Sequence, residues 1–254
     1  MLSEKISLAG KTAFITGSSQ GIGKGIALAM AEYGAKIILH YRKNLDEAKE
    51  VAGEIRKLGS TAVIVGGDLS RPRAVSALYN QVTKKAASPD ILVLNASVQI
   101  PKVWQDITQE DFDIQVNANF RSTFLLMQRF APEMVSKGWG RILTVGSVQQ
   151  IKPHPSMMIY AATKSAVLNM VQNAAMQLAD KGVTVNNLAP GVIGTSRIEE
   201  DVPEAEERIS QRLGTPSGQI GDPEDCAAMA VLLCSEAGRF ITGQNIYVDG
   251  GMSL

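Results

Sequence analysis

The sequence predicts one α/β domain, a doubly wound, seven-stranded parallel sheet with helices on both faces. Short apolar runs alternate with helical patterns along the chain of 254 residues, the order of elements that a parallel sheet with crossover helices requires. Several runs are apolar almost throughout, as expected of strands that are buried on both faces. The first run leads through a glycine-rich turn directly into a helix, which is how sheets of this class open.

The individual elements follow from where each apolar pattern starts and stops. The expected strands are Thr12–Thr16, Lys36–Tyr41, Thr61–Val65, Ile91–Asn95, Arg141–Val145, Val183–Leu188 and Asn245–Val248. The expected helices are Gly21–Tyr33, Leu45–Leu58, Pro72–Ala87, Gln109–Ser136, Ser156–Asp180 and Pro223–Cys234. A polar segment at about residues 195–221 interrupts the alternation. Because long irregular insertions are often functional, we expect a ligand flap there, within a single domain of residues 1–254.

The composition excludes several classes of function. Hydrophobic residues make up 45% of the chain and charged residues 20%, which is ordinary for a soluble globular domain. The net charge is zero and there is no basic block, which argues against a nucleic-acid partner. The start of the chain lacks a signal-peptide pattern, and no run approaches the roughly 20 apolar residues of a membrane span, so we expect no membrane association.

The cysteines and histidines indicate neither a disulfide nor a metal site. Cys226 and Cys234 fall on one expected helix, about 12 Å apart along its axis, which is too far for a disulfide. We expect them to fill the core of a cytoplasmic protein, in a reducing compartment. His40 and His154 lie far apart in the sequence and in no ligand-like cluster, so no bound metal is expected.

The stretch from Thr16 to Gly23, Thr-Gly-Ser-Ser-Gln-Gly-Ile-Gly, joins the first strand to the first helix. Gly17 permits a tight turn, Gly21 lets a phosphate approach the backbone, and Gly23 lets the helix pack closely on the strand. The helix begins with N–H groups that attract an anion. The stretch predicts a dinucleotide diphosphate site; the alternative is a glycine-rich turn without a ligand.

The second strand ends at Tyr41 and is followed by Arg42 and Lys43. A coenzyme with free ribose hydroxyls usually meets an acidic residue about 20 positions beyond the glycines, and none stands between Lys36 and Leu45. A guanidinium suits the charge of a 2′-phosphate. The loop therefore favours NADP(H) and leaves NAD(H) possible, and the alternative is a solvated basic loop.

A candidate catalytic set follows the fifth strand, which leads into Gly146 and Ser147. Tyr160 and Lys164 stand at helical i and i+4 positions near the start of the next helix, with Cβ atoms about 6 Å apart. Free tyrosine is only about a thousandth ionised at pH 7, and a neighbouring ammonium favours the phenolate that acid/base chemistry uses. Ser147 can hold a substrate oxygen by a hydrogen bond.

In combination, the glycine stretch and these three residues resemble the single-domain branch of the short-chain dehydrogenase/reductase family. The resemblance runs from Leu8 to Gly251. It implies a Rossmann-type fold, an NAD(P) coenzyme, and hydride transfer to or from a secondary alcohol or ketone. The chain departs from the family where Leu94-Asn95-Ala96-Ser97 replaces Asn-Asn-Ala-Gly. It also departs at Gln20, where the family often has a second basic residue, which weighs against a strong NADP preference.

The resemblance implies a catalytic role for Asn119, Ser147, Tyr160 and Lys164. Tyr160 is the expected acid/base, and Lys164 is also expected to hydrogen-bond the nicotinamide ribose. Spacing within the family favours Asn119 over Asn117 as the residue that holds a water linking Lys164 to solvent.

The resemblance also implies the path of the coenzyme. Asp68 would lie along the adenine, although Asp68 and Ser70 could instead cap the next helix. The backbone of Ile193 and the hydroxyl of Thr195 would bind the carboxamide. The implied coenzyme-binding residues are Gly17, Ser19, Gln20, Gly21, Ile22, Gly23, Tyr41, Arg42, Asp68, Leu69, Asn95, Ala96, Tyr160, Lys164, Pro190, Gly191, Ile193 and Thr195.

The substrate is less narrowly defined. The amides and the imidazole near the catalytic set favour a small hydroxylated alcohol or ketone, such as a sugar or polyol. Glutamates in the flap disfavour a highly anionic substrate, which weakens the alternative of a 3-oxoacyl thioester reductase, although they could simply form a solvated helix face. The expected substrate-binding residues are Ser147, Gln149, His154, Met157 and Tyr160, with Gln150 and the flap Ser196–Leu213 beside them.

Two further expectations concern partners and class. The helices Gln109–Ser136 and Ser156–Asp180 carry wide apolar faces, and family members pair such helices about two-fold axes, so the resemblance implies a homotetramer with 222 symmetry. A nucleotide-binding regulatory protein without turnover is the alternative from another class. The four intact catalytic residues argue against it.

Overall fold

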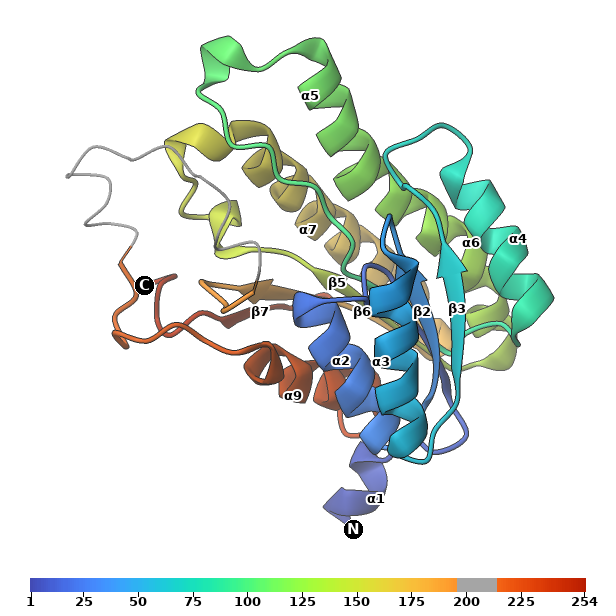
Figure 1. The fold of residues 1–254 in the computed structure, drawn as a ribbon. Helices are drawn as coiled ribbons and strands as arrows, with labels where there is room; N and C mark the ends of the chain where they lie inside the picture. The colour runs from blue at the N-terminus through green and yellow to red at the C-terminus, as the bar shows by residue number, and fades with distance from the viewer. Residues whose placement is uncertain (196–213) are drawn as a thin grey trace.

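The computed structural model describes residues 1–195 and 214–254, and its centre is one parallel sheet (Figure 1). The strand order is β3-β2-β1-β4-β5-β6-β7, and every neighbouring pair is parallel. The strands are β1 (Thr12–Ile15), β2 (Lys36–Tyr41), β3 (Ala62–Gly66), β4 (Ile91–Leu94), β5 (Gly140–Val145), β6 (Val183–Pro190) and β7 (Asn245–Val248). The predicted doubly wound sheet is confirmed.

Helices cover both faces of this sheet, and two apolar clusters fill the space between the layers. One cluster packs α2, α3 and α9 on one face, and the other packs α4, α6 and α7 on the opposite face. The helices are α1 (Leu2–Ile6), α2 (Gly21–Glu32), α3 (Leu45–Lys57), α4 (Ala74–Lys85), α5 (Gln109–Gln115), α6 (Ser122–Lys137), α7 (Met158–Leu178) and α9 (Pro223–Cys234). Strands β1, β4, β5 and β6 are buried along their full length, which explains the nearly continuous apolar sequences of β1 and β4. Strands β5 and β6 also bury polar residues, among them Arg141, Asn186 and Asn187.

The order of the strands determines where a ligand can bind. Successive strands run outward from β1 to β3, and the chain then returns to place β4 on the other side of β1. The connections on the two sides of β1 therefore lead away from one another, and a crevice opens at the carboxyl ends of β1 and β4. Asn95 and the glycine stretch after β1 both lie at this position.

The predicted helix Gln109–Ser136 is interrupted by a π-helical turn, η2 (Val116–Arg121). Two hydroxyls at the start of α6 donate back to carbonyls of this turn, Ser122 Oγ to Ala118 O at 2.6 Å and Thr123 Oγ1 to Asn119 O at 2.7 Å. The Asn119 side chain is held by the neighbouring loop. The apolar pattern of this stretch is compatible with one continuous helix, so the sequence alone does not reveal the turn.

Smaller differences concern ends and caps. The terminal helix α1 has no buried residue and is too short to give a periodic pattern. Helix α4 begins at Ala74 rather than Pro72, because Arg73 adopts a left-handed conformation with φ of 63°. Asp68 therefore does not cap α4; its carboxylate accepts hydrogen bonds from the backbone and hydroxyl of Ser70. Short 3-10 turns η1 (Trp104–Asp106), η3 (Val148–Gln150), η4 (Pro155–Met157) and η5 (Ala179–Lys181) complete the chain.

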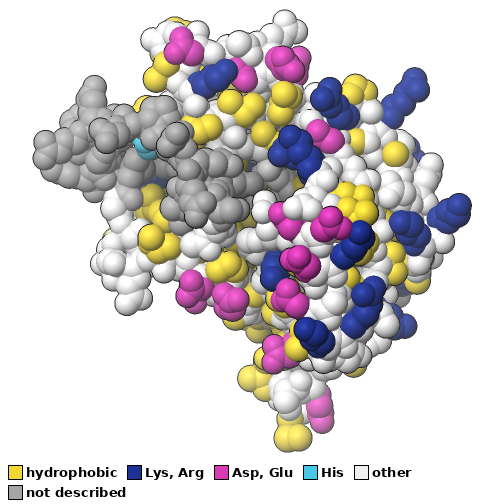
Figure 2. Space-filling model, in the orientation of Figure 1, with side chains coloured by type: hydrophobic (Ala, Val, Ile, Leu, Met, Phe, Trp, Pro, Cys, Tyr) yellow, Lys and Arg dark blue, Asp and Glu magenta, His cyan; other side chains and the backbone are white. Residues whose placement is uncertain are grey.

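Several predictions outside the sheet can be compared with this fold. Cys226 and Cys234 are separate buried thiols, and burial raises the pKa of each to about 12. Within the described ranges, no helix combines the length and apolar character needed to cross a membrane. On the face in Figure 2, acidic and basic side chains are interspersed. The core of the predicted flap, Ser196–Leu213, lies outside the described residues.

Candidate active site

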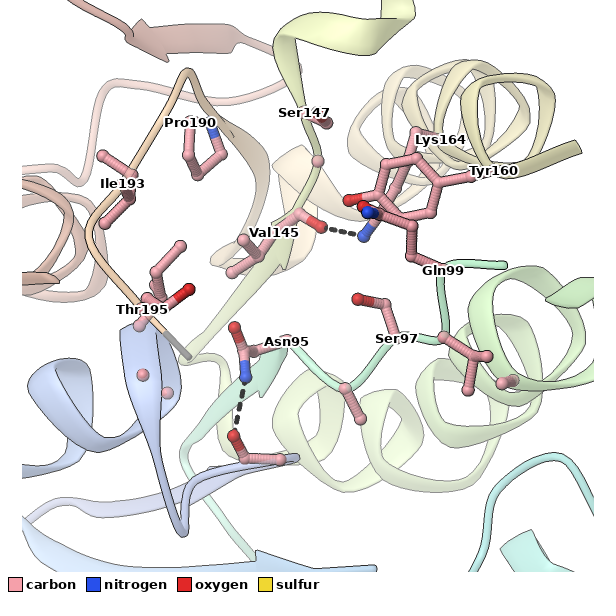
Figure 3. A pocket seen from close by; sticks show the side chains of 18 of the residues that line it. Asn95, Ser97, Gln99, Val145, Ser147, Tyr160, Lys164, Pro190, Ile193 and Thr195 are labelled. Atoms are coloured by element: carbon pink, nitrogen blue, oxygen red, sulfur yellow. Dashed lines mark hydrogen bonds between the residues drawn. The ribbon is translucent and has the colours of Figure 1, made fainter. Parts of the chain in front are cut away.

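A cavity of about 560 Å³ lies over the carboxyl edge of the sheet, at the crevice that the strand order creates (Figure 3). Its walls come from the segments that follow β1 to β6. The glycine stretch and Arg42 line it together with Ser147, Tyr160 and Lys164. Residues that are far apart in the sequence therefore share one site.

The glycine stretch owes its shape to close backbone contacts. Gly17 and Gly21 have φ of 63° and 57°, a region that side chains rarely allow. A Cβ at Gly23 would overlap the carbonyl oxygen of Gly17 and lie 2.5 Å from Asn95 Nδ2. Asn95 Nδ2 itself donates to Thr16 O at 2.9 Å and to Gly17 O at 2.8 Å. The loop is thus fixed between β4 and the start of α2, whose first N–H groups face the cavity side.

His40 holds the same loop from the other side. Its Nδ1 accepts a hydrogen bond from Gly17 N at 3.0 Å, and its Nε2 lies 2.9 Å from Gly67 O. Since a backbone N–H can only donate and a carbonyl can only accept, the imidazole must be neutral with its proton on Nε2. Burial lowers the pKa of His40 to about 4, although the Gly67 carbonyl and the charge of Asp68 act in the opposite direction.

The adenosine end of the cavity combines a cation with a carboxylate. Arg42 and Asp68 both line it. Partial burial favours the protonated acid, but hydrogen bonds from Ser70 and the charges of Arg42 and Arg71 hold the pKa of the Asp68 carboxyl below its usual value. Asp68 is therefore ionised at neutral pH and offsets part of the positive charge of Arg42.

Tyr160 and Lys164 project together into the other end of the cavity, as Figure 3 shows. Both are buried, and Lys164 Nζ lies 5.4 Å from the centroid of the Tyr160 ring. Lys164 Nζ donates to Val145 O at 2.6 Å, which ties α7 to the end of β5. Ser147 lies two residues after the end of β5, and its Oγ accepts a hydrogen bond from Gln149 N at 3.2 Å. The arrangement brings a hydroxyl, a phenol and an ammonium to one place.

Asn119 lies beside this group rather than in the cavity lining. Its Oδ1 accepts from Val98 N at 2.7 Å, and its Nδ2 donates to Val98 O at 2.9 Å and to Thr163 Oγ1 at 3.1 Å. Its amide thus connects the π-helical turn, the segment after β4 and helix α7. These three hydrogen bonds explain why the Asn119 side chain is buried rather than exposed to solvent.

Two other expected residues also lie outside the lining. The Tyr41 ring packs where a Cβ of Gly66 would stand, so it does not face the coenzyme side. His154 caps η4, with its Nδ1 accepting from Ser156 N at 3.2 Å, and it is therefore occupied by its own turn. Gln150, which was expected beside the substrate, also lies outside the lining, and the expected flap Ser196–Leu213 is not among the described residues. The other residues expected to bind coenzyme or substrate line the cavity.

The lining also includes residues that the sequence did not single out for a site. They are chiefly the loop after β4, with Val98 and Gln99, and Met252 near the end of the chain. Gln99 extends toward Tyr160 and Lys164 in Figure 3. Gln99 lies in the loop after β4, a strand that ends at the crevice, and this position was the sequence signal that could have identified it as a site residue.

Fold and cavity together define a dinucleotide-binding α/β protein with a serine, tyrosine and lysine at the far end of the nucleotide site. A family model described as Enoyl-(Acyl carrier protein) reductase matches residues 17–253. The 7alpha-hydroxysteroid dehydrogenase of Escherichia coli K12 is 38% identical over 250 residues, covering 98% of this chain and 96% of that protein.

Two solved structures are similar over almost their full length. A 3-oxoacyl (acyl-carrier-protein) reductase from Agrobacterium tumefaciens C58 with NADP bound has a TM-score of 0.90 and 36% identity, covering 99% of this chain and 97% of that one. A gluconate 5-dehydrogenase from Burkholderia cenocepacia J2315 in complex with NADP and tartrate has a TM-score of 0.89 and 30% identity, covering 100% and 99%.

The chain belongs to the short-chain dehydrogenase/reductase family. It is an NAD(P)-dependent oxidoreductase that acts on CH–OH groups and the corresponding ketones. The predicted family, fold, reaction class and nicotinamide coenzyme are confirmed. The relatives act on substrates as different as steroids, acyl thioesters and sugar acids, so the family alone leaves the substrate open.

The environment of His40 predicts a pH-dependent stability. Its pKa is lowered to about 4 in the folded protein, whereas an unfolded histidine titrates near 6.5, so between these values only the unfolded chain gains the proton. Stability should therefore fall by about 3 kcal/mol as the pH is lowered from 7 to 4. Urea unfolding of the wild type and of His40→Gln across this range measures it. The variant should lack this part of the pH dependence, and identical slopes would contradict the assignment.

Proposed function

We propose that this protein transfers hydride between NADP(H) and the secondary alcohol or ketone of a small hydroxylated substrate, with Tyr160 as the acid/base. The observation that carries the proposal is the buried Tyr160–Lys164 pair at one end of a cavity whose other end is the glycine stretch. When bound, the nicotinamide supplies or accepts the hydride. The chain supplies the proton, the orientation of the substrate oxygen and the exclusion of water.

The residues present fit such a coenzyme. Gly21, Ile22 and Gly23 line the cavity with their backbone, since Gly23 has no side chain to part the helix from Gly17, and the start of α2 offers N–H groups to a diphosphate. Pro190, Gly191, Ile193 and Thr195 line the cavity after β6, where the predicted carboxamide contacts require them. These lining residues support a diphosphate site at the glycine stretch and a nicotinamide site beside Tyr160.

The proton path begins at Tyr160. During reduction, its hydroxyl gives a proton to the carbonyl oxygen of the substrate, and during oxidation the phenolate takes the proton of the alcohol. The Lys164 ammonium lies 5.4 Å from the centroid of the Tyr160 ring, beside the group that exchanges the proton. Ser147 holds the substrate oxygen by a hydrogen bond. Asn119 fixes the loop after β4 through its two hydrogen bonds to the backbone of Val98. We propose that it also helps to hold a water beside Lys164.

The polar lining around Tyr160 supports a hydroxylated substrate. Ser97, Gln99 and Gln149 lie there with the apolar Val98 and Met157. Gln149 Oε1 accepts from His154 N at 2.6 Å, which fixes its amide so that Nε2 is the donor left for a ligand. Hydroxyl or carboxylate oxygens of a sugar-like substrate match this donor. The alternative is a 3-oxoacyl thioester, which the similarity to acyl-carrier-protein reductases favours.

A substrate panel tests this choice. Absorbance of the reduced coenzyme is followed with sugar acids, polyols, hydroxysteroids and 3-oxoacyl thioesters, each with both coenzymes. The highest kcat/KM is expected for a polyol or sugar acid with NADP(H). A preference for 3-oxoacyl thioesters would select the alternative, and no turnover with any substrate would support a non-catalytic nucleotide-binding protein.

Removing the Tyr160 hydroxyl should separate chemistry from binding. Tyr160→Phe should lower kcat by about 10²–10⁴, the usual contribution of a positioned acid/base, while coenzyme affinity is retained. Tyr33→Phe, on an exposed residue at the end of α2, is the matched control and should retain full activity. Steady-state kinetics and fluorescence titration of NADPH give the two quantities. A Tyr160→Phe protein with near wild-type turnover would refute the mechanism.

The coenzyme preference is expected to depend on Arg42. Loss of its charge-assisted hydrogen bonds to a 2′-phosphate should weaken NADPH binding about 10- to 100-fold relative to NADH in Arg42→Asp. Arg56→Asp, which alters an exposed arginine of α3 outside the cavity, should leave the ratio unchanged. If the wild type binds NADH at least as tightly as NADPH, or if Arg42→Asp leaves the ratio unaltered, this assignment is wrong.

The proposed assembly is a homotetramer with 222 symmetry in the cytoplasm. Support comes from large apolar side chains that are exposed on α5, α6 and α7, namely Phe112, Phe124, Met158 and Met176. Burying such side chains is worth about 1.5–3 kcal/mol each, which favours association. Light scattering at micromolar concentration should give four times the chain mass of 27.2 kDa. A stable monomer would contradict it.

A further inference from the structure

Gln150, which the sequence placed beside the substrate, directs its amide into the protein instead. Its Oε1 accepts from Ser147 N at 3.3 Å and from Asn187 Nδ2 at 3.3 Å. Its Nε2 donates to the backbone oxygen of Lys164 at 3.1 Å. Both ends of the amide are occupied, and Gln150 is not part of the cavity lining. It therefore contacts the backbones of two proposed catalytic residues without facing the substrate.

The amide belongs to a larger network that is buried at Thr144 and Asn187 and half-buried at Gln150 and Asn245. Asn187 on β6 is fully buried, accepts from Thr144 Oγ1 on β5 at 2.5 Å, and donates to Asn245 Oδ1 on β7 at 2.6 Å. Through Gln150 the network reaches η3 and helix α7. Three adjacent strands and the catalytic helix are thus joined by side-chain hydrogen bonds. A buried network whose members are satisfied is rigid, because breaking any one bond leaves a polar group without water.

The backbone beside the network is shaped to admit this amide. A Cβ at Gly146 would lie 2.6 Å from Gln150 Oε1 and would overlap Asn187 Nδ2. Only glycine at this position lets the end of β5 approach both side chains. Gly146 is the residue directly before Ser147, so the same contact fixes the point where the chain leaves the strand.

We propose that Gln150 is a positioning residue that sets the distance between Ser147 and the Tyr160–Lys164 pair. This role rests on the proposed function. The substrate oxygen must reach Ser147 and Tyr160 together, and these residues stand on different elements that Gln150 joins at the backbone. The position requires an acceptor toward Ser147 and Asn187 and a donor toward Lys164. A glutamine supplies both, whereas a glutamate supplies only acceptors when ionised.

Two substitutions distinguish the hydrogen bonds that Gln150 accepts from the one that it donates. Gln150→Leu removes all of them at similar volume, and Gln150→Glu keeps the acceptor and loses the donor. A misplacement of the order of 1 Å can cost about 100-fold in rate, so kcat of Gln150→Leu should fall by about 10- to 100-fold, with Gln150→Glu in between. The Kd for NADPH should stay within about twofold of the wild type, because Gln150 bonds only the backbone oxygen of Lys164 among the expected coenzyme-binding residues, and none of those expected at the diphosphate and the 2′-phosphate. Gln177→Leu, on the exposed end of α7, is the matched control.

All rates are expressed per NADPH-binding site, so loss of folded protein does not count as loss of kcat. The predicted order of kcat is wild type, then Gln150→Glu, then Gln150→Leu, at equal coenzyme affinity. Wild-type kcat in Gln150→Leu would overturn this role while leaving the proposed function intact. Equal losses of kcat and coenzyme affinity would indicate a general structural role and would also overturn it. Absence of turnover in the wild type would overturn the proposed function and this role together.

Discussion

The site depends on one close contact, the packing of helix α2 at Gly23 against the backbone of Gly17. The carbonyl oxygen of Gly17 lies where a side chain at position 23 would begin, and Asn95 Nδ2 fills the remaining space by bonding Thr16 O and Gly17 O. The start of α2 is thereby held at the carboxyl end of β1. A diphosphate can then meet backbone N–H groups, whose arrangement needs no charged side chain from the loop itself.

The remaining parts of the site follow from the parallel sheet. Since all strands end at the same edge, Ser147 after β5 and the loop after β4 come together although they are far apart in sequence. Three of these loops are fixed by polar side chains: Gly17 by the buried His40, Val98 by the buried Asn119, and Ser147 by the half-buried Gln150. Under the proposed function, coenzyme and catalytic groups are therefore held by a fixed backbone.

The sequence was sufficient for the fold because local signals agree with the global arrangement. Apolar runs, helical periodicity and the glycine stretch each indicate the same sheet, and β2 and β7 have the predicted bounds. That the side chains of Tyr160 and Lys164 lie close together was predictable, because their helical spacing places them on one face of the helix. His154, Tyr41 and Gln150 were not, since their orientation depends on partners such as Ser156, Gly66 and Asn187 that no local pattern identifies. The π-helical turn around Asn119 was not predicted, because the apolar pattern there is compatible with one continuous helix.

The most direct test of this account is the affinity for NADPH after Gly23→Ala, measured by calorimetry beside Gly53→Ala. Gly53 is also a helical glycine, but a Cβ there meets nothing within 4 Å. Overpacking at Gly23 should be relieved in the free protein by a shift of α2 away from Gly17. If coenzyme binding must reverse that shift at a cost of about 1–3 kcal/mol, binding becomes about 5- to 150-fold weaker in a protein that still folds. Gly53→Ala should bind as the wild type does. Unchanged affinity in Gly23→Ala would contradict the account, because the loop would then not depend on this contact.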